Sequence, residues 1–253
     1  MTITASKWIM LQNKNILVTG ATSGIGYAVT CDLLDAGANV IAIGRNVERL
    51  TKLTQRDATR VQTIAFDLTR FTDYRTTFNG LPTLDGVVCS AGAADSNPLR
   101  FFSLEKYQQL IDINQTAPIA LIAELARASK LRSGASIVLL ASILGPKIGR
   151  PGATAYASSK AALTGFAKVA ALELANKLVR INCLLPGMVD TELAEGQAEV
   201  SQEARQADMQ RYPLGKRYAQ VTEITATIRF LLSAESSFMT GQELVIDGGF
   251  CTQ

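Results

Sequence analysis

Short apolar segments alternate with longer amphipathic stretches along the whole chain, and this alternation limits the fold more than any other feature. The apolar segments are 16–18, 39–43, 61–66, 86–89, 136–140, 179–185 and 243–246. Nearly continuous apolar strands separated by helices are typical of a parallel sheet that helices cover on both faces. We therefore predict a doubly wound, Rossmann-type α/β fold, in which ligands bind at the carboxyl ends of the strands.

The amphipathic stretches between these segments predict helices. The first begins near Ser23 and Gly24, and Asn46 is a candidate N-cap for the second. Further helices are expected at about 104–130, 154–177, 192–209 and 222–233. Because no repeat or Pro/Gly-rich linker interrupts the pattern, we predict a single domain over residues 1–253. The polar segment 192–217 is either a surface helix pair or a lid over a substrate site.

The chain contains no histidine, and this absence excludes several kinds of site. A Ser-His-Asp triad and a helical zinc-binding His pair are both ruled out. Acid–base chemistry must therefore use Tyr, Lys, Asp, Glu or Cys. The net charge is only +3, and the longest basic cluster, Lys130–Arg132, is too short for a nucleic-acid footprint. We expect neither a nucleic-acid partner nor a metal site.

The cysteines and the apolar content indicate the compartment. Cys31, Cys89, Cys183 and Cys251 are far apart and form no CxxC pair, which favours buried thiols in a reducing environment. The first apolar run, 8–11, is too short for a signal peptide, and no window reaches the ~18 apolar residues of a membrane span. We predict a cytoplasmic protein without a membrane partner.

A glycine-rich turn follows the first predicted strand directly and opens the first predicted helix. The turn runs from Thr19 to Gly26 with the spacing Gly-x-x-x-Gly-x-Gly and has no Gly-Lys-Ser/Thr ending. Glycine lets the backbone N–H groups approach a pyrophosphate, and the helix N-terminus adds partial positive charge. The turn alone is a weak signal, since tight turns use glycine for steric reasons. Its position favours a dinucleotide over a P-loop nucleotide.

The residues after the second predicted strand bear on the choice of cofactor. An acid about 20 residues after the glycine turn commonly binds the ribose 2′-hydroxyl of NAD. Gly44 stands at that place and Arg45 follows it, which favours the 2′-phosphate of NADP over NAD. The alternative is that Arg45 is a solvated loop residue. Asp67, after the third strand, is either a hydrogen-bond acceptor for adenine or a strand-end cap.

A phenol and an amine lie four residues apart on one predicted helix face, at Tyr156 and Lys160. The pKa of a free tyrosine is near ~10, so a neighbouring cation is needed to favour its phenolate at neutral pH. Ser142 lies just past an apolar strand, where this fold holds its site. Asn114 lies in an otherwise apolar helical stretch, where a polar amide needs a partner. A chain that combines the glycine turn with Asn114, Ser142 and the Tyr-x-x-x-Lys pair gives a far more specific signal of function than any one of these motifs.

With these residues in this order, the sequence resembles the classical short-chain dehydrogenase/reductase family. It looks nearest to the bacterial 3-oxoacyl-[acyl carrier protein] reductases. The matching residues are Thr19–Gly26, Asp67, Leu68, Ser90–Gly92, Asn114, Ser142, Tyr156, Lys160, Pro186, Gly187, Thr191, Thr240, Gly241 and Asp247–Gly249.

The resemblance implies roles for individual residues. Tyr156 is then the general acid/base, and Lys160 holds the nicotinamide ribose and lowers the tyrosine pKa. Ser142 orients the substrate oxygen, and Asn114 positions a water in a proton relay. Together with the inferences above, the resemblance gives the expected cofactor contacts, namely Gly20, Thr22, Ser23, Gly24, Ile25, Gly26, Arg45, Asp67, Leu68, Ala91, Gly92, Asn114, Tyr156, Lys160, Pro186, Gly187, Val189 and Thr191.

These inferences predict an NADP-dependent oxidoreductase that transfers a hydride between nicotinamide and a ketone or secondary alcohol. A 3-oxoacyl thioester is one expected substrate, and the main alternative is a sugar, polyol or steroid alcohol. A non-catalytic NADP-binding regulator on the same fold is the alternative from another class. Lys147, Arg150 and Arg100 are cations expected near the mouth of the site, where they indicate either an anionic substrate or ordinary surface charge.

Apolar residues on two predicted helices indicate assembly. The stretches 104–130 and 154–177 carry more apolar surface than one sheet face is expected to cover. The apolar residues are Ile119, Leu121, Ile122, Leu125, Leu163, Phe166, Val169, Ala170 and Leu174. The resemblance implies that these helices pair across a two-fold axis in a homotetramer. Residues 243–246 and Phe250 would supply a second interface, unless Phe250 packs on its own subunit.

Overall fold

Parallel strands form a single sheet at the centre of the protein. The computed structural model describes residues 11–191 and 202–252. Within these residues the sheet has seven strands in the order β3-β2-β1-β4-β5-β6-β7, all parallel. The strands are β1 (Asn15–Thr19), β2 (Asn39–Gly44), β3 (Val61–Ala65), β4 (Leu84–Cys89), β5 (Leu131–Leu140), β6 (Arg180–Pro186) and β7 (Glu243–Ile246). The predicted doubly wound α/β fold is confirmed.

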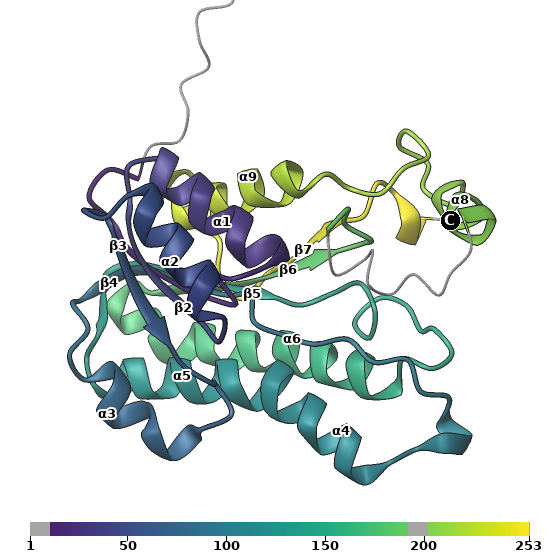
Figure 1. Cartoon of the computed structure of the whole chain (residues 1–253), viewed down its shortest axis with the longest axis horizontal. Helices are drawn as coiled ribbons and strands as arrows, with labels where there is room; N and C mark the ends of the chain where they lie inside the picture. Colours follow the sequence, from purple (N-terminus) through teal and green to yellow (C-terminus); the bar gives the residue numbers. More distant parts are fainter. Residues whose placement is uncertain (1–10, 192–201, 253) are drawn as a thin grey trace, which may run out of the picture.

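Helices cover both faces of the sheet (Figure 1). One face carries α1 (Gly24–Asp35), α2 (Val47–Arg56) and α9 (Val221–Leu232). The other carries α3 (Tyr74–Phe78), α4 (Leu104–Ile111), α5 (Ala117–Arg127) and α6 (Thr154–Leu174), while α8 (Gln202–Met209) lies beyond the carboxyl ends of β6 and β7. Shorter helical turns are η1 (Phe71–Asp73), η2 (Leu99–Phe101), η3 (Asp112–Thr116), η4 (Ala175–Lys177), η5 (Ala234–Ser236) and η6 (Phe250–Thr252).

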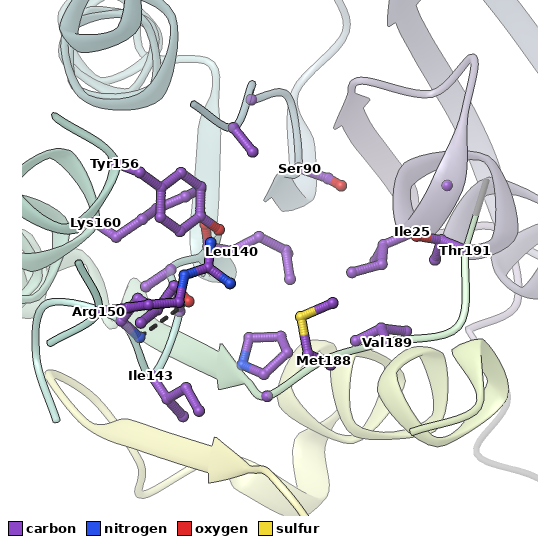
Figure 2. Close-up of a pocket in the computed structure, with 18 of the residues that line it drawn as sticks. Ile25, Ser90, Leu140, Ile143, Arg150, Tyr156, Lys160, Met188, Val189 and Thr191 are labelled. Carbon is purple, nitrogen blue, oxygen red and sulfur yellow. Dashed lines mark hydrogen bonds between the residues drawn. The ribbon is translucent and has the colours of Figure 1, made fainter. Parts of the chain in front are cut away.

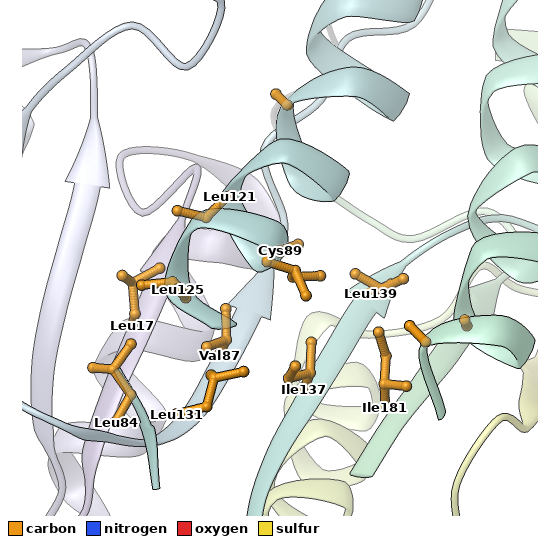
Figure 3. Packing of buried hydrophobic residues seen from close by; sticks show 14 of the residues in the cluster. Leu17, Leu84, Val87, Cys89, Leu121, Leu125, Leu131, Ile137, Leu139 and Ile181 are labelled. Atoms are coloured by element: carbon orange, nitrogen blue, oxygen red, sulfur yellow. The ribbon is translucent and has the colours of Figure 1, made fainter. Parts of the chain in front are cut away.

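Each face of the sheet has its own hydrophobic core, because every inner strand is covered on both sides. Leu121 and Leu125 of α5 belong to the same core as Val87, Ile137 and Ile181, which are neighbours on β4, β5 and β6 (Figure 3). On the opposite face α1 and α9 pack together over the sheet. This two-sided burial is the reason why the strands appear in the sequence as continuous apolar runs.

The predicted cap of α2 is present. The Asn46 side chain accepts a hydrogen bond of 2.9 Å from the backbone N–H of Arg49. At α9, Gln220 and Glu223 form a reciprocal capping box. Both devices satisfy N–H groups that a helix start leaves without partners.

One helical prediction differs from the structure. The stretch predicted as one helix over 104–130 is α4 and α5 joined by the π-helical turn η3, and β5 already begins at Leu131. The short α3 was not predicted. Of the stretch predicted as a helix over 192–209, residues 202–209 form α8, and residues 192–201 lie outside the described residues.

The apolar residues assigned to an interface between subunits are mostly covered within one chain, which corrects that argument. Leu121, Ile122, Leu125, Leu163 and Ala170 are buried in the core. Ile119, Phe166 and Leu174 are partly buried against it. Of the assigned helix residues only Val169 is exposed, at 56%, and Leu172 of α6, which was not assigned, is exposed at 80%.

The strand order places a switch point between β1 and β4, because β2 lies on one side of β1 and β4 lies on the other. Open α/β sheets bind ligands at such a point. The Thr19 hydroxyl accepts hydrogen bonds of 3.2 Å from the backbone N–H groups of Ser90 and Ala91. This contact joins the carboxyl ends of the two strands at the site. All four cysteines are free thiols, and none of the described helices is long and apolar enough to cross a bilayer.

Candidate active site

A cleft of about 310 Å³ opens at the carboxyl ends of the strands. The glycine turn and the segment after β4 line one side, and the ends of β5 and β6 with the start of α6 line the other (Figure 2). Asp208, Arg211, Tyr212 and Phe250 complete the wall. The predicted site residues that line this cleft are Gly20, Ser23, Gly24, Ile25, Ala91, Gly92, Ser142, Tyr156, Lys160, Pro186, Gly187, Val189 and Thr191.

The glycine turn is held by close backbone contacts. Gly20 has a φ of +68°, and a Cβ there would lie 2.8 Å from the Cα of Ala91. A Cβ on Gly26 would lie 2.2 Å from the Gly20 carbonyl oxygen, so Gly26 supports the turn without lining the cleft. Helix α1 therefore begins directly at the cleft, with its N-terminal N–H groups and partial positive charge at that edge. This cradle fits the phosphates of a dinucleotide.

Thr22 lies behind the turn, away from the cleft. A Cβ on Gly44 would lie only 2.5 Å from the Thr22 methyl carbon, so an acid at position 44 requires Thr22 to move. The Thr22 carbonyl accepts a 3.0 Å hydrogen bond from Arg49. Arg49 follows Arg45 by four residues, one helical turn, and this spacing is the sequence signal for the second cation.

Arg45 lies at the outer end of the site. Its side chain is 80% exposed, and its guanidinium is 4.0 Å from the Asp67 carboxylate. That carboxylate also accepts bonds from the backbone N–H and the hydroxyl of Thr69, and these bonds with the nearby arginines hold its pKa below the usual value. Asp67 is thus a strand-end cap, and its contact with adenine stays a prediction. The Leu68 side chain is in the core, so only its backbone is available to a cofactor.

Tyr156 and Ser142 face each other across the base of the cleft. The Ser142 hydroxyl hydrogen-bonds the phenol oxygen and also accepts a 3.1 Å bond from the Leu144 N–H. Burial raises the pKa of Tyr156, while the Ser142 hydrogen bond and the charge of Arg150 oppose this shift. The phenol is therefore protonated at neutral pH and suited to give a proton to a carbonyl oxygen.

Lys160 is buried one helical turn below Tyr156. Its ammonium donates a 2.6 Å hydrogen bond to the Leu140 carbonyl and lies 5.7 Å from the centre of the Tyr156 ring. Burial lowers the pKa of Lys160 to about 8. Ser142 and Arg150 favour the Tyr156 phenolate, and the same effect of Lys160 stays a prediction.

Asn114 lies in the π-helical turn η3 and is buried behind the cleft. Its side chain accepts a 2.8 Å bond from the Ala93 N–H and donates a 2.9 Å bond to the Ala93 carbonyl. It also donates to the Ser159 hydroxyl at 3.1 Å, and Ser159 donates to the Tyr156 carbonyl at 2.7 Å. The Asn114 amide thus has the hydrogen-bond partners that were expected for a polar side chain in an apolar helical stretch. The link through Ser159 was not predicted, since a serine within a helix gives no signal of its own.

The remaining predicted contacts lie on two segments after β4 and β6. A Cβ on Gly92 would lie 3.0 Å from the Asn114 side-chain oxygen, so the chain passes close over that amide. After β6, the Pro186 carbonyl accepts from the Ile143 N–H at 3.2 Å, and Gly187 donates to the Ile246 carbonyl at 2.9 Å. Val189 and Thr191, further along this segment, line the cleft beside Ile25 (Figure 2).

The far wall contains residues that sequence reasoning did not assign to the site. Tyr212 is buried, accepts a 3.1 Å bond from the Met188 N–H and stacks on Phe250, with ring centres 4.9 Å apart. Phe250 therefore packs on its own subunit, the alternative to a role in an interface. Asp208, Arg211 and Tyr212 belong to the segment 192–217, whose role as a lid stays a prediction.

Comparison with known proteins identifies the class. Residues 20–251 match the profile of a family described as enoyl-(acyl carrier protein) reductase. The chain is 33% identical to a 3-oxoacyl-[acyl-carrier-protein] reductase of Chlamydia muridarum over 95% of this chain and 98% of that protein. It is 32% identical to the L-xylulose reductase of Bos taurus over 96% of this chain and 98% of that protein.

Solved structures agree with these relatives. A short-chain dehydrogenase family protein from Francisella tularensis superposes with a TM-score of 0.84 at 32% identity, over 95% of this chain and 100% of that one. A gluconate 5-dehydrogenase from Burkholderia cenocepacia, in complex with NADP and tartrate, superposes with a TM-score of 0.88. The two are 26% identical, over 97% of this chain and 98% of that one. The chain belongs to the short-chain dehydrogenase/reductase family. It is an oxidoreductase that acts on CH–OH groups, in a family that uses NAD or NADP.

Proposed function

We propose that this protein is an NADP-dependent reductase of ketones, with Tyr156 as the general acid/base. The observation that carries the proposal is the placement of a protonated phenol, its Ser142 partner and a buried lysine opposite a phosphate-binding turn in one cleft. When bound, NADPH supplies the hydride. The protein then has to bind, orient and deliver one proton.

Each part of the chain has a defined task in this reaction. The Ser142 hydroxyl orients the carbonyl oxygen of the substrate, and Tyr156 gives that oxygen its phenolic proton. The phenolate formed is favoured by the charge of Arg150 and by the hydrogen bond from Ser142. Lys160 holds the nicotinamide ribose, and Asn114 fixes the segment at Ala93 and the backbone of Tyr156.

The preference for NADP is proposed from Arg45, with Arg49 beside the same turn. NADP is also named in the gluconate 5-dehydrogenase structure from Burkholderia cenocepacia. The Arg45 side chain is largely exposed, so solvent screens part of its interaction with a 2′-phosphate. We expect Arg45→Asp to weaken NADPH binding about tenfold, or roughly 1.4 kcal/mol, and to leave NADH binding nearly unchanged.

Fluorescence titration of both cofactors checks this expectation. Arg75→Asp makes the same charge change at an exposed position of helix α3 and serves as the control. Equal affinity of the wild type for NADPH and NADH would contradict the proposal.

Two substrate classes are supported by relatives. The 3-oxoacyl thioesters follow from the reductase of Chlamydia muridarum, and small sugars or polyols follow from the bovine L-xylulose reductase. The experiment that tests the proposed function is NADPH oxidation with a panel of acetoacetyl thioesters, diketones, ketoses and uncharged ketones. Reduction of at least one ketone is expected, and NADPH that remains unoxidised with every member would overturn the proposal.

We further propose a homotetramer in the cytoplasm. The exposed apolar residues Val169 and Leu172 on α6 support the assembly, since such a patch is commonly covered by a partner. The four free thiols support a reducing compartment.

A further inference from the structure

Arg150 differs from the other cations that line the cleft, because its guanidinium makes no hydrogen bond or ion pair with the described part of the chain. Lys160 donates to the Leu140 carbonyl at 2.6 Å. Arg211 pairs with Asp208 at 3.1 Å and lies 4.5 Å over the Phe250 ring. Arg150 lines the same cleft with its charge uncompensated by a described carboxylate. A ligand anion can therefore pair with it without displacing a protein partner.

The backbone that carries Arg150 is held on several sides. Within the loop between β5 and α6, Gly145 donates to the Ile148 carbonyl at 2.8 Å, and Ala153 donates to the Arg150 carbonyl at 3.1 Å. The Gly152 carbonyl accepts a 2.7 Å bond from Asn97 in the segment after β4. A Cβ on Gly145 would lie 2.1 Å from the Ala157 carbonyl, so the loop packs directly on α6. The loop thus presents Arg150 from a fixed position.

Arg150 points at the reacting end of the cleft. Figure 2 shows its side chain directed toward the hydroxyl end of Tyr156. Its charge is close enough to favour the Tyr156 phenolate and so to lower the pKa of that phenol. A substrate carbonyl placed at Tyr156 therefore lies within a few atoms of the guanidinium.

The other cations of the region are already engaged. Lys147, on the same loop, pairs with Glu243 at 2.9 Å and does not line the cleft. Arg100 lies 4.7 Å over the ring of Phe101. Of the three cations that the sequence placed near the mouth, Arg150 is the one that lines the cleft.

We propose that Arg150 binds the carboxylate of the substrate, which makes the substrates of this enzyme oxo acids and the corresponding hydroxy acids. Guanidinium and carboxylate match in a planar, two-point contact that also fixes the orientation of the substrate. Ile143, Ile148 and Met188 line the cleft beside it and suit a short carbon chain. This inference rests on the proposed ketone reduction and names its substrate class.

The test compares each oxo acid with its own methyl ester, which keeps the ketone and removes the charge. NADPH oxidation is measured with 2-, 3- and 5-oxo acids and their esters. We expect the wild type to prefer the acid. Arg150→Met is expected to lower kcat/KM for both substrates, because the charge that favours the Tyr156 phenolate is lost. The acid loses its ion pair as well, so the acid-to-ester ratio of kcat/KM should fall ~10–100-fold, since a hydrogen bond to a charged group is worth that much. Arg150→Lys should recover part of the preference.

Lys147→Met is the matched control, because it removes a cation of the same loop that lies outside the cleft. It should leave the acid-to-ester ratio unchanged. A second pair, dihydroxyacetone and its phosphate, distinguishes a carboxylate from a phosphate, and a preference for the phosphate would overturn the assignment of a carboxylate.

The remaining outcomes are decisive in different ways. If Arg150→Met lowers acid and ester equally, Arg150 acts on Tyr156 alone and the carboxylate site is refuted. If uncharged ketones are reduced and acids are not preferred, the proposed function stands and this inference fails. If no ketone of either panel is reduced, the proposed function fails, and the carboxylate site fails with it.

Discussion

Tyr156 combines a raised pKa with two polar neighbours, Ser142 and Arg150. We expect Tyr156→Phe to lower kcat by ~10²-fold or more, since it removes the proton donor and changes little else. Cofactor affinity should be unchanged. NADPH oxidation and fluorescence titration measure the two quantities. Tyr107→Phe, outside the cleft, is the control, and a Tyr156→Phe enzyme with most of its turnover would remove this phenol from the mechanism.

Lys160 links folding stability to pH, because burial lowers its pKa from the ordinary 10.5 to about 8. Between these two pH values the lysine is protonated in the unfolded chain and neutral in the folded protein. The contribution of Lys160 to the free energy of unfolding therefore rises as pH increases from about 8 to 10.5, and the gain is lost when pH returns to 8. We expect the free energy of unfolding of the wild type, relative to Lys160→Met, to rise over this window by roughly 2–3 kcal/mol. Urea titrations from pH 7 to 10 measure it, and a constant difference would contradict it.

At the scale of elements, the π-helical turn η3 connects α4 and α5 to the segment after β4 through Asn114. Asn114→Leu removes both side-chain bonds to the backbone of Ala93 and the buried bond to the Ser159 hydroxyl. We expect the free energy of unfolding to fall by about 2–4 kcal/mol. Urea denaturation measures it, with Gln55→Leu on the exposed side of α2 as the control. A loss as small as that of the control would show that Ala93 finds other partners.

The sequence predicts strands and long helices well and their interruptions poorly. All seven strands were expected because buried parallel strands are continuous apolar runs. The π-helical turn at Asp112–Thr116 preserves the helical hydrophobic pattern, so nothing in the sequence marks it. Helix α3 has five residues, too few for a periodic signal.

Many of the residues predicted for the site line the cleft, but their contacts could not be predicted. The positions of Tyr156, Ser142 and Lys160 relative to the strands carried the prediction. Which of Lys147, Arg150 and Arg100 faces the cleft depends on how one loop packs on α6. That packing joins residues distant in sequence, and no local pattern records it.

At the scale of the whole molecule, the proposed tetramer predicts a mass about four times 27.1 kDa in light scattering. Charges on the exposed face of α6 should break it, so the double variant Val169→Glu, Leu172→Glu is expected to give smaller particles. Val47→Glu, equally exposed on α2, is the control. A wild-type mass of one chain would show that the monomer tolerates this patch in water.

The contact between Thr19 and the segment Ser90–Ala91 has a kinetic consequence for the chain. These partners are 71 and 72 residues apart in sequence, and the glycine turn adopts its shape against Ala91. Loop-closure entropy must be overcome before this contact can form, and parallel pairings of such separation fold slowly. The phosphate cradle therefore forms together with the central strands, late and cooperatively. A fragment that ends before β4 would contain every glycine of the turn and still bind no dinucleotide.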